Sequence, residues 1–221
     1  MLTGILVKSI LSGVLVAALA TTNAGASLCD SAAQRASSET GVPLDVMLTI
    51  TRLETGRGKG VDPWPWTVNH AGDGSWFPSE DDARSYVFSK IKRGASNIDI
   101  GCFQINYRWH ADGFRSLDDM FNPDLNALYA ANFLNQLYRE FGTWTEAVGA
   151  YHSRTPEFAE RYKSKFHTLR GRVAILDVPV PKALKPNRKL VFGRQGTARP
   201  GSAFLTDATG AQPFIPLNRT N

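Results

Sequence analysis

The chain has 221 residues, of which 43% are hydrophobic and 20% charged, a composition that suits one compact globular domain with tails. The formal net charge of +5 indicates a basic surface, which could attract nucleic acid or other anionic polymers. The four histidines are scattered and no Cys/His cluster has the ligand spacing of a zinc site, which argues against a metal centre of that kind (His70, His110, His152 and His167).

The first 26 residues have the pattern of an export signal. Lys8 supplies the positive flank, residues 10–20 are apolar or small without interruption, and Ala24-Gly25-Ala26 fits a small-x-small cleavage site. The apolar run is too short to span a bilayer comfortably, which disfavours a retained membrane anchor, and no later segment is long enough either. We therefore predict a signal peptide over residues 1–26 and a periplasmic or secreted protein with no stable membrane span after cleavage. For such a protein the basic surface favours anionic cell-envelope polymers over nucleic acid.

Two cysteines, Cys29 and Cys102, remain after the predicted cleavage. An even pair in an oxidising compartment favours one disulfide, which would tie the first mature residues to the segment that carries Gln104. Two separate buried thiols are the simpler alternative. Lipidation at Cys29 is a further alternative, disfavoured by the large residue that precedes it.

Capping residues and helix breakers divide the middle of the chain into helices. A small-residue stretch over 30–40 ends at Gly41, and the next helix begins at Pro43 and ends at Gly56. Later helices are each preceded by a capping sequence or an Asn-Pro or Thr-Pro pair, and we expect them over 83–93, 122–142, from 143 and from 155 to about 169.

Two irregular regions and a tail complete the pattern. Residues 62–77 form a loop rich in tryptophan, and residues 97–110 alternate loosely, which predicts a short strand or an extended turn. Beyond Gly171 the chain is basic and rich in proline, with no amphipathic pattern long enough for a second core. We therefore predict a mainly helical domain over 27–170 with a small irregular or β-containing region, and an extended or disordered tail over 171–221.

Glu54 stands out as a lone carboxylate on an apolar helical stripe. At about 100° per residue it lies almost over Met47 and close to Ile50. An apolar surface disfavours the charged carboxylate and raises its pKa, which is what a general acid near neutral pH requires. The commoner role of a glutamate near a helix end is that of a solvated surface group.

Three ordered segments resemble the lytic transglycosylases of the soluble-Slt, lysozyme-like superfamily. They are Leu53-Glu54-Thr55, the DIGCFQIN segment 99–106, and Ala150-Tyr151-His152-Ser153, where the family usually has Glu-Ser, Gly-Leu-Met-Gln-Ile-Asn and Ala-Tyr-Asn-Ala-Gly. The resemblance implies a goose-type, lysozyme-like helical fold and no cofactor. It also implies cleavage of the MurNAc-β-1,4-GlcNAc bond of peptidoglycan glycan strands, with a 1,6-anhydro-MurNAc product.

The resemblance also implies roles for individual residues. Glu54 would act first as acid and then as base, and the Tyr151 hydroxyl would orient its carboxyl group. The residues expected to bind or present the glycan are Gln104, Asn106, Phe103 and Trp66, although core packing or loop bracing are alternatives for each. His152 and Ser153 replace the usual Asn-Ala pair, so the resemblance assigns them no role.

Two other functions remain open. A hydrolytic lysozyme (muramidase) needs a second carboxylate, and Asp62, Asp73 and Asp99 are the nearest candidates. None has a sequence context that ties it to this role, which favours ring closure over hydrolysis. A non-catalytic peptidoglycan-binding or assembly protein of the same fold is the other alternative. From the family alone we expect local wall opening for an envelope-spanning assembly, such as a secretion or conjugation apparatus.

Overall fold

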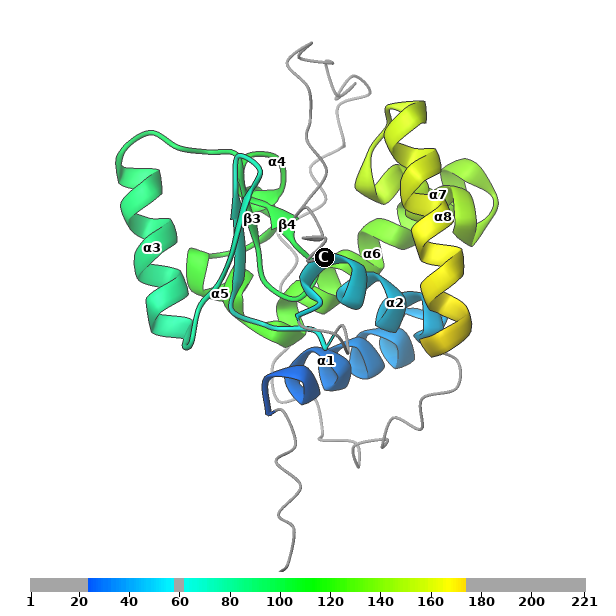
Figure 1. Cartoon of the computed structure of the whole chain (residues 1–221), viewed down its shortest axis with the longest axis horizontal. Coiled ribbons are helices and arrows are strands. Elements are labelled where there is room, and N and C mark those ends of the chain that lie inside the picture. The colour runs from blue at the N-terminus through cyan, green and yellow to red at the C-terminus, as the bar shows by residue number, and fades with distance from the viewer. Residues whose placement is uncertain (1–23, 58–61, 174–221) are drawn as a thin grey trace, which may run out of the picture.

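The computed structural model describes residues 24–57 and 62–173, so most of the predicted signal peptide and the tail from residue 174 lie outside the described residues. The described part is mainly helical, as predicted (Figure 1). Its helices are α1 (Ala24–Thr40), α2 (Leu44–Thr55), α3 (Glu80–Lys92), α4 (Tyr107–His110), α5 (Leu117–Phe121), α6 (Pro123–Phe141), α7 (Trp144–His152) and α8 (Pro156–Val173), with a short 3₁₀ turn at Ala111–Gly113. No helix in these two ranges is long and apolar enough to cross a membrane.

Local capping chemistry explains where the helices begin and end. The Ser79 hydroxyl accepts a hydrogen bond from the Asp82 N–H at the start of α3, and Thr143 caps α7 in the same way. Asn122 caps α6 and is followed by proline in the first turn, where the missing N–H costs nothing. Gly41 and Gly142 follow α1 and α6 with φ of +78° and +79°, the left-handed conformation that glycine adopts without strain. The ends of α1 and α3 agree with the predicted ones to within one residue, but both helices begin earlier than predicted, at Ala24 and Glu80.

The small β region is a four-stranded antiparallel sheet in the order β2-β1-β3-β4. Its strands are β1 (Thr67–His70), β2 (Asp73–Trp76), β3 (Ile98–Ile100) and β4 (Ile105–Asn106). The expected β-containing region is therefore present, but the loop predicted over 62–77 contains a hairpin. The turn residues Ala71 and Gly72 both have positive φ, +54° and +100°, as the tight hairpin turn requires. Alanine is an uncommon choice there, so the usual hairpin signal is missing from the sequence.

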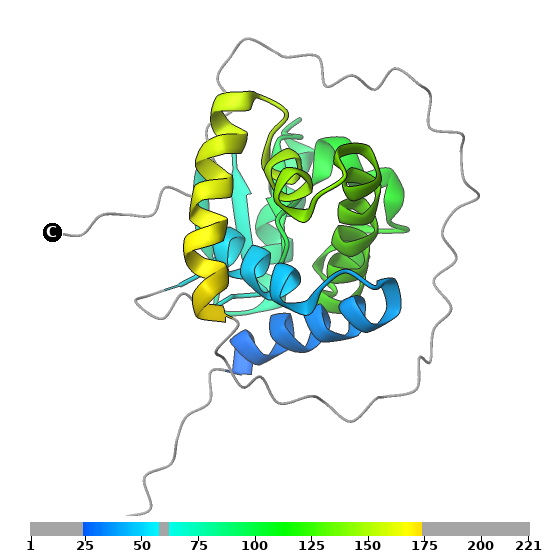
Figure 2. The ribbon, with the colours of Figure 1, turned by 90° about the vertical axis from the view of Figure 1, so that its right-hand side faces the viewer.

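The core lies between the helices and one face of the sheet. Helix α6 occupies the middle of the molecule, with α3 and the sheet on one side and α7 and α8 on the other (Figure 1). Helix α8 packs against both α7 and α2, and α1 packs beneath α2 and α6 (Figure 2). Met47 and Ile50 of α2 are fully buried in this core, so the apolar stripe predicted from the sequence faces inward.

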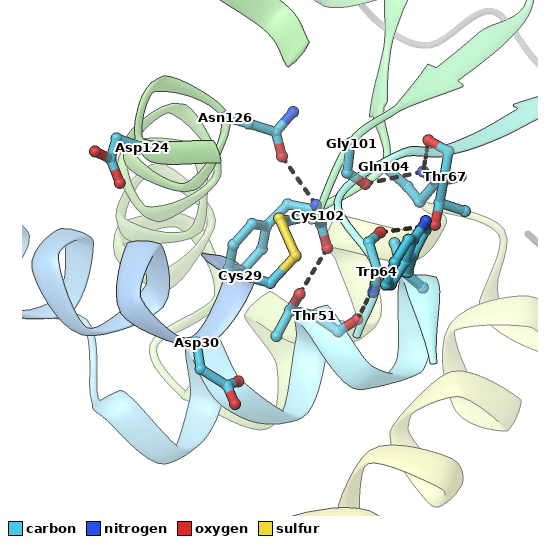
Figure 3. The surroundings of a disulfide bond; sticks show 12 residues. Cys29, Asp30, Thr51, Trp64, Thr67, Gly101, Cys102, Gln104, Asp124 and Asn126 are labelled. Atoms are coloured by element: carbon cyan, nitrogen blue, oxygen red, sulfur yellow. Dashed lines mark hydrogen bonds between the residues drawn. A yellow bond between two sulfur atoms is a disulfide. The ribbon is translucent and has the colours of Figure 1, made fainter. Parts of the chain in front are cut away.

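The predicted disulfide between Cys29 and Cys102 is present, with the two Cα atoms 5.5 Å apart. It joins α1 to the loop between β3 and β4 (Figure 3). The same loop is held from α2, because the Thr51 hydroxyl donates to the Cys102 carbonyl at 2.8 Å. It is held from α6 as well, because the Phe103 N–H donates to the Asn126 side chain at 2.9 Å. The GCFQIN segment is thus fixed to three helices before it reaches the site.

Candidate active site

Glu54 lies in the last turn of α2 and is only 2% exposed, although its side chain carries a carboxyl group. The Tyr162 hydroxyl, from α8, donates a hydrogen bond of 2.5 Å to Glu54 Oε1. The other oxygen, Oε2, is also buried, and no group in the described part of the chain forms a hydrogen bond with it. The carboxyl group is therefore anchored through one oxygen only.

Burial raises the pKa of Glu54 to about 8, chiefly because a desolvated carboxylate is disfavoured. The Tyr162 hydrogen bond and the Lys165 ammonium act in the opposite direction, and the negative charge of Asp99 raises the pKa further. At neutral pH the Glu54 carboxyl group is therefore protonated in most molecules. Because the Tyr162 hydroxyl proton occupies Oε1, the acidic proton resides on Oε2.

The orienting tyrosine is Tyr162 and not Tyr151, which corrects the sequence-based expectation. The Tyr151 hydroxyl donates to the Phe103 carbonyl at 2.7 Å, so this side chain braces the GCFQIN loop from α7. Tyr151 still lies near the acidic groups, because the charges of Glu54 and Asp99 both help to raise its pKa. The expected contact fails because α8, rather than the end of α7, supplies the hydroxyl that faces Glu54.

Asp99 is a second buried carboxyl group at this site. It belongs to β3, is 5% exposed, and accepts a hydrogen bond of 2.7 Å from the Asn106 side-chain amide. Burial raises its pKa to about 7, against the opposing effect of the Asn106 hydrogen bond. Of the three aspartates considered from the sequence, Asp62 and Asp73 are exposed and only Asp99 is coupled to Glu54.

Burial raises the pKa of both carboxyl groups, and a negative charge on Asp99 helps to retain the proton on Glu54. Asn106 fixes Asp99 and also caps α4, because its side-chain oxygen accepts from the Arg108 N–H at 3.0 Å. Its bracing role is thus visible, whereas contact with a glycan stays a prediction.

Gln104 is locked by the backbone around it (Figure 3). Its side-chain amide donates to the Thr67 and Gly101 carbonyls at 3.0 and 2.9 Å, and its backbone has a strained φ of +47°. The amide nitrogen is therefore fully used. Only the buried Oε1 has no partner among the described residues, so any hydrogen bond from Gln104 to a sugar has to be accepted there.

Two aromatic residues proposed from the sequence differ in their placement. Phe103 is fully buried in the core, so the expected contact with sugar faces is wrong: its side chain points into the protein because the loop is anchored on both sides of it. Trp66 is half-buried and packs on the edge of the core, and its stacking on sugar stays a prediction. Nearby, Trp64 and Trp76 donate their indole N–H groups to the Phe77 and Thr55 carbonyls, which are structural roles.

Tyr162 and His152 are the site residues that sequence reasoning missed. Tyr162 belongs to the apolar series of α8 and is predicted only as a packing residue, since nothing local marks its hydroxyl as facing Glu54. The His152 ring stacks on the Tyr162 ring, with centroids 4.3 Å apart. Among the described residues no group of three or more His, Cys, Asp or Glu side chains is placed to hold a metal ion.

Comparison with known protein families matches residues 80–169 to the Transglycosylase SLT domain. Neither the curated proteins nor the solved structures contain a significant match. The matched range begins at α3 and ends within α8, so it includes Asp99, Tyr151 and Tyr162 but starts after Glu54. The tertiary structure joins Glu54 to the matched part through the Tyr162 hydrogen bond. Residues 80–169, which include Asp99, Tyr151 and Tyr162, are therefore similar to the transglycosylase SLT domain.

Proposed function

We propose that this protein is a peptidoglycan lytic transglycosylase that cleaves the MurNAc-β-1,4-GlcNAc bond and forms a 1,6-anhydro-MurNAc end. The SLT-domain match supports transglycosylase-type activity on peptidoglycan at the level of the family. The observation that carries the proposal is the state of Glu54: a buried acid with a pKa of about 8, held at Oε1 by Tyr162 and with its proton on Oε2, which has no partner among the described residues. These are the properties of a general acid waiting for an acceptor.

The reaction uses this carboxyl group twice. Glu54 Oε2 donates its proton to the glycosidic oxygen, the C1–O bond breaks, and the neighbouring N-acetyl carbonyl oxygen bonds to C1 and takes up the positive charge. The resulting Glu54 carboxylate then removes the proton from the C6 hydroxyl, and O6 displaces the acetamido oxygen from C1. Because the buried site disfavours the carboxylate, Glu54 regains a proton readily, which suits the second step.

Asp99 favours a second candidate function, which is hydrolysis. A carboxylate close to a general acid can stabilise the developing positive charge, attack C1 or activate water, as in two-carboxylate glycosidases. Asp99 is buried, its negative charge raises the pKa of Glu54, and its side chain is held by Asn106. Asp99 is thus a candidate for the second acid that the sequence context did not identify, and the product has to decide between the two reactions.

The test incubates purified peptidoglycan with wild-type protein, Glu54→Gln and Asp99→Asn, and analyses the products by mass spectrometry. The proposal predicts anhydro-muropeptides from the wild type, none from Glu54→Gln, and the same product at a lower rate from Asp99→Asn. Reducing-end muramic acid that is lost in both variants would establish the lysozyme instead. No cleavage by the wild type between about pH 5 and pH 9 would leave the non-catalytic binding or assembly protein.

Export and cellular role belong to the same proposal. The disulfide supports an oxidising compartment, since such bonds are rare in reducing ones. We therefore propose that the protein works in the periplasm or outside the cell, where peptidoglycan lies. Local wall opening for a secretion or conjugation apparatus is the cellular role that we propose on family grounds alone.

A further inference from the structure

His152, the last residue of α7, forms an almost parallel stack with Tyr162 of α8. The ring centroids are 4.3 Å apart and the ring planes differ by only 8°. The stack of Tyr138 on Trp144 has the same spacing but a tilt of 25°, and it joins α6 to α7. His152 therefore stacks on one face of the ring whose hydroxyl bonds to Glu54.

The stacking contact bears on the Tyr162 ring, whose hydroxyl holds Glu54. Tyr162 is 6% exposed and its hydroxyl lies 2.5 Å from Glu54 Oε1, so a small tilt of the ring would lengthen the hydrogen bond. Helices α7 and α8 pack against each other (Figures 1 and 2), and each of them supplies one ring of the stack. The hydrogen bond therefore depends on the position of the ring, and the imidazole of His152 contacts that ring.

The charge state of His152 suits this role. Burial, with a contribution from the Lys165 ammonium, lowers the pKa of His152 to about 4. The imidazole is thus neutral throughout the pH range in which Glu54 titrates, so it adds no cation that would pull the proton from Glu54. The other groups that act on Glu54 are Asp99 from β3, which raises its pKa, and Lys165 from α8, which lowers it.

We infer that His152 is a positioning residue, whose ring holds Tyr162 flat so that the tyrosine hydroxyl stays on Glu54 Oε1 and the acidic proton stays on Oε2. The inference rests on the proposed role of Glu54 as general acid. It assigns a physical role to a position where this chain departs from the family's usual asparagine. In this role His152 affects Glu54 only through Tyr162.

A double-mutant cycle tests this role with His152→Leu, which keeps the side-chain volume but removes the flat ring, and Tyr162→Phe. We expect each single change to lower kcat about tenfold with KM within about twofold. We expect the double variant to lie within about twofold of Tyr162→Phe, and His152→Phe to keep kcat within about threefold of wild type. Tyr138→Leu, which removes the other stack, is the matched control and should leave kcat unchanged. If the fold-decreases in kcat of the two single variants multiply in the double variant, His152 acts independently of Tyr162, and the inference is overturned.

A titration of the Glu54 carboxyl by carbon-13 NMR gives a readout that does not need turnover. The Tyr162 hydrogen bond lowers the pKa of Glu54, so Tyr162→Phe should raise this pKa. His152→Leu should raise it in the same direction, and His152→Phe should leave it unchanged. An unchanged Glu54 titration in His152→Leu would contradict the positioning role. If His152→Leu does not fold, His152→Asn takes its place in both experiments. If the wild type cleaves no glycan, the proposed function fails while the titration still decides the inference.

Discussion

Replacing Glu54 with glutamine should stabilise the protein, and the gain should grow with pH. The pKa of Glu54 is about 8 in the folded state, against the ordinary value of 4.5 that applies to the unfolded chain. The folded state therefore binds the proton more tightly, so the wild type loses stability as the pH rises from 4.5 through 8. Glutamine keeps the shape and has no proton to lose, so the variant lacks this loss.

The size of the effect follows from the two pKa values. One pKa unit corresponds to about 1.36 kcal/mol, so the wild type loses about 3 kcal/mol between pH 4 and pH 7 relative to a group that does not titrate. Most of the loss is complete by pH 8, where Glu54 is fully ionised in the unfolded chain and about half ionised in the folded state. Glu54 is almost fully buried, so solvent does not screen this contribution away.

Urea unfolding of the disulfide-bonded protein at pH 5, 6, 7 and 8 measures the difference in the free energy of unfolding between wild type and Glu54→Gln. We expect the difference to change by about 2 kcal/mol between pH 5 and pH 7. Any constant offset from the glutamine amide itself cancels in this comparison. Glu157→Gln removes an exposed carboxylate from α8 and is the control, which should not reproduce the trend.

A difference that stays constant within about 0.5 kcal/mol across this pH range would refute the reasoning. It would mean that Glu54 ionises in the folded state as easily as in the unfolded chain. The role of Glu54 as a general acid near neutral pH would then lose its physical basis, whatever the activity of the variant.

Three further predictions concern Asp99 and the loop between β3 and β4. Asp99→Asn removes the charge that raises the pKa of Glu54, so the alkaline limb of the pH profile of kcat/KM should move to lower pH; an unmoved limb would show that the two groups are not coupled. Reducing the Cys29–Cys102 disulfide opens a loop with a sequence separation of 73, so it should lower the free energy of unfolding, measured with urea, by about 4 kcal/mol. A decrease of less than about 1 kcal/mol would contradict this expectation. Gly101→Ala should destabilise the protein by about 2 kcal/mol in the same assay, because φ is +79° and the new Cβ would lie 2.9 Å from the Asn126 amide; an unchanged midpoint would count against a strained loop.

Much of the fold could be predicted because it depends on short-range chemistry. A capping side chain, a proline in the first turn or a glycine with positive φ acts within a few residues, so the ends of α1 and α3 and both boundaries of α6 could be predicted from the local sequence. The hairpin of β1 and β2 could not be predicted, because it depends on features that the local sequence does not show. Its turn uses Ala71 in a conformation that alanine rarely adopts, and pairing with β3 supports it from a distant part of the chain.

The candidate site could likewise be predicted only in part: the position of Glu54 on its helix could be, but its partners could not. The sequence by itself determined that Glu54 lies on the buried face of α2, because helical periodicity places it above Met47 and Ile50. Only the tertiary structure decided its partners: α8 brings Tyr162 to one oxygen, β3 brings Asp99 close enough to raise its pKa, and α7 stacks His152 on the tyrosine. The physical reason is distance along the chain, since periodicity specifies which face a residue occupies, whereas the packing of helices far apart in the sequence selects the group opposite it.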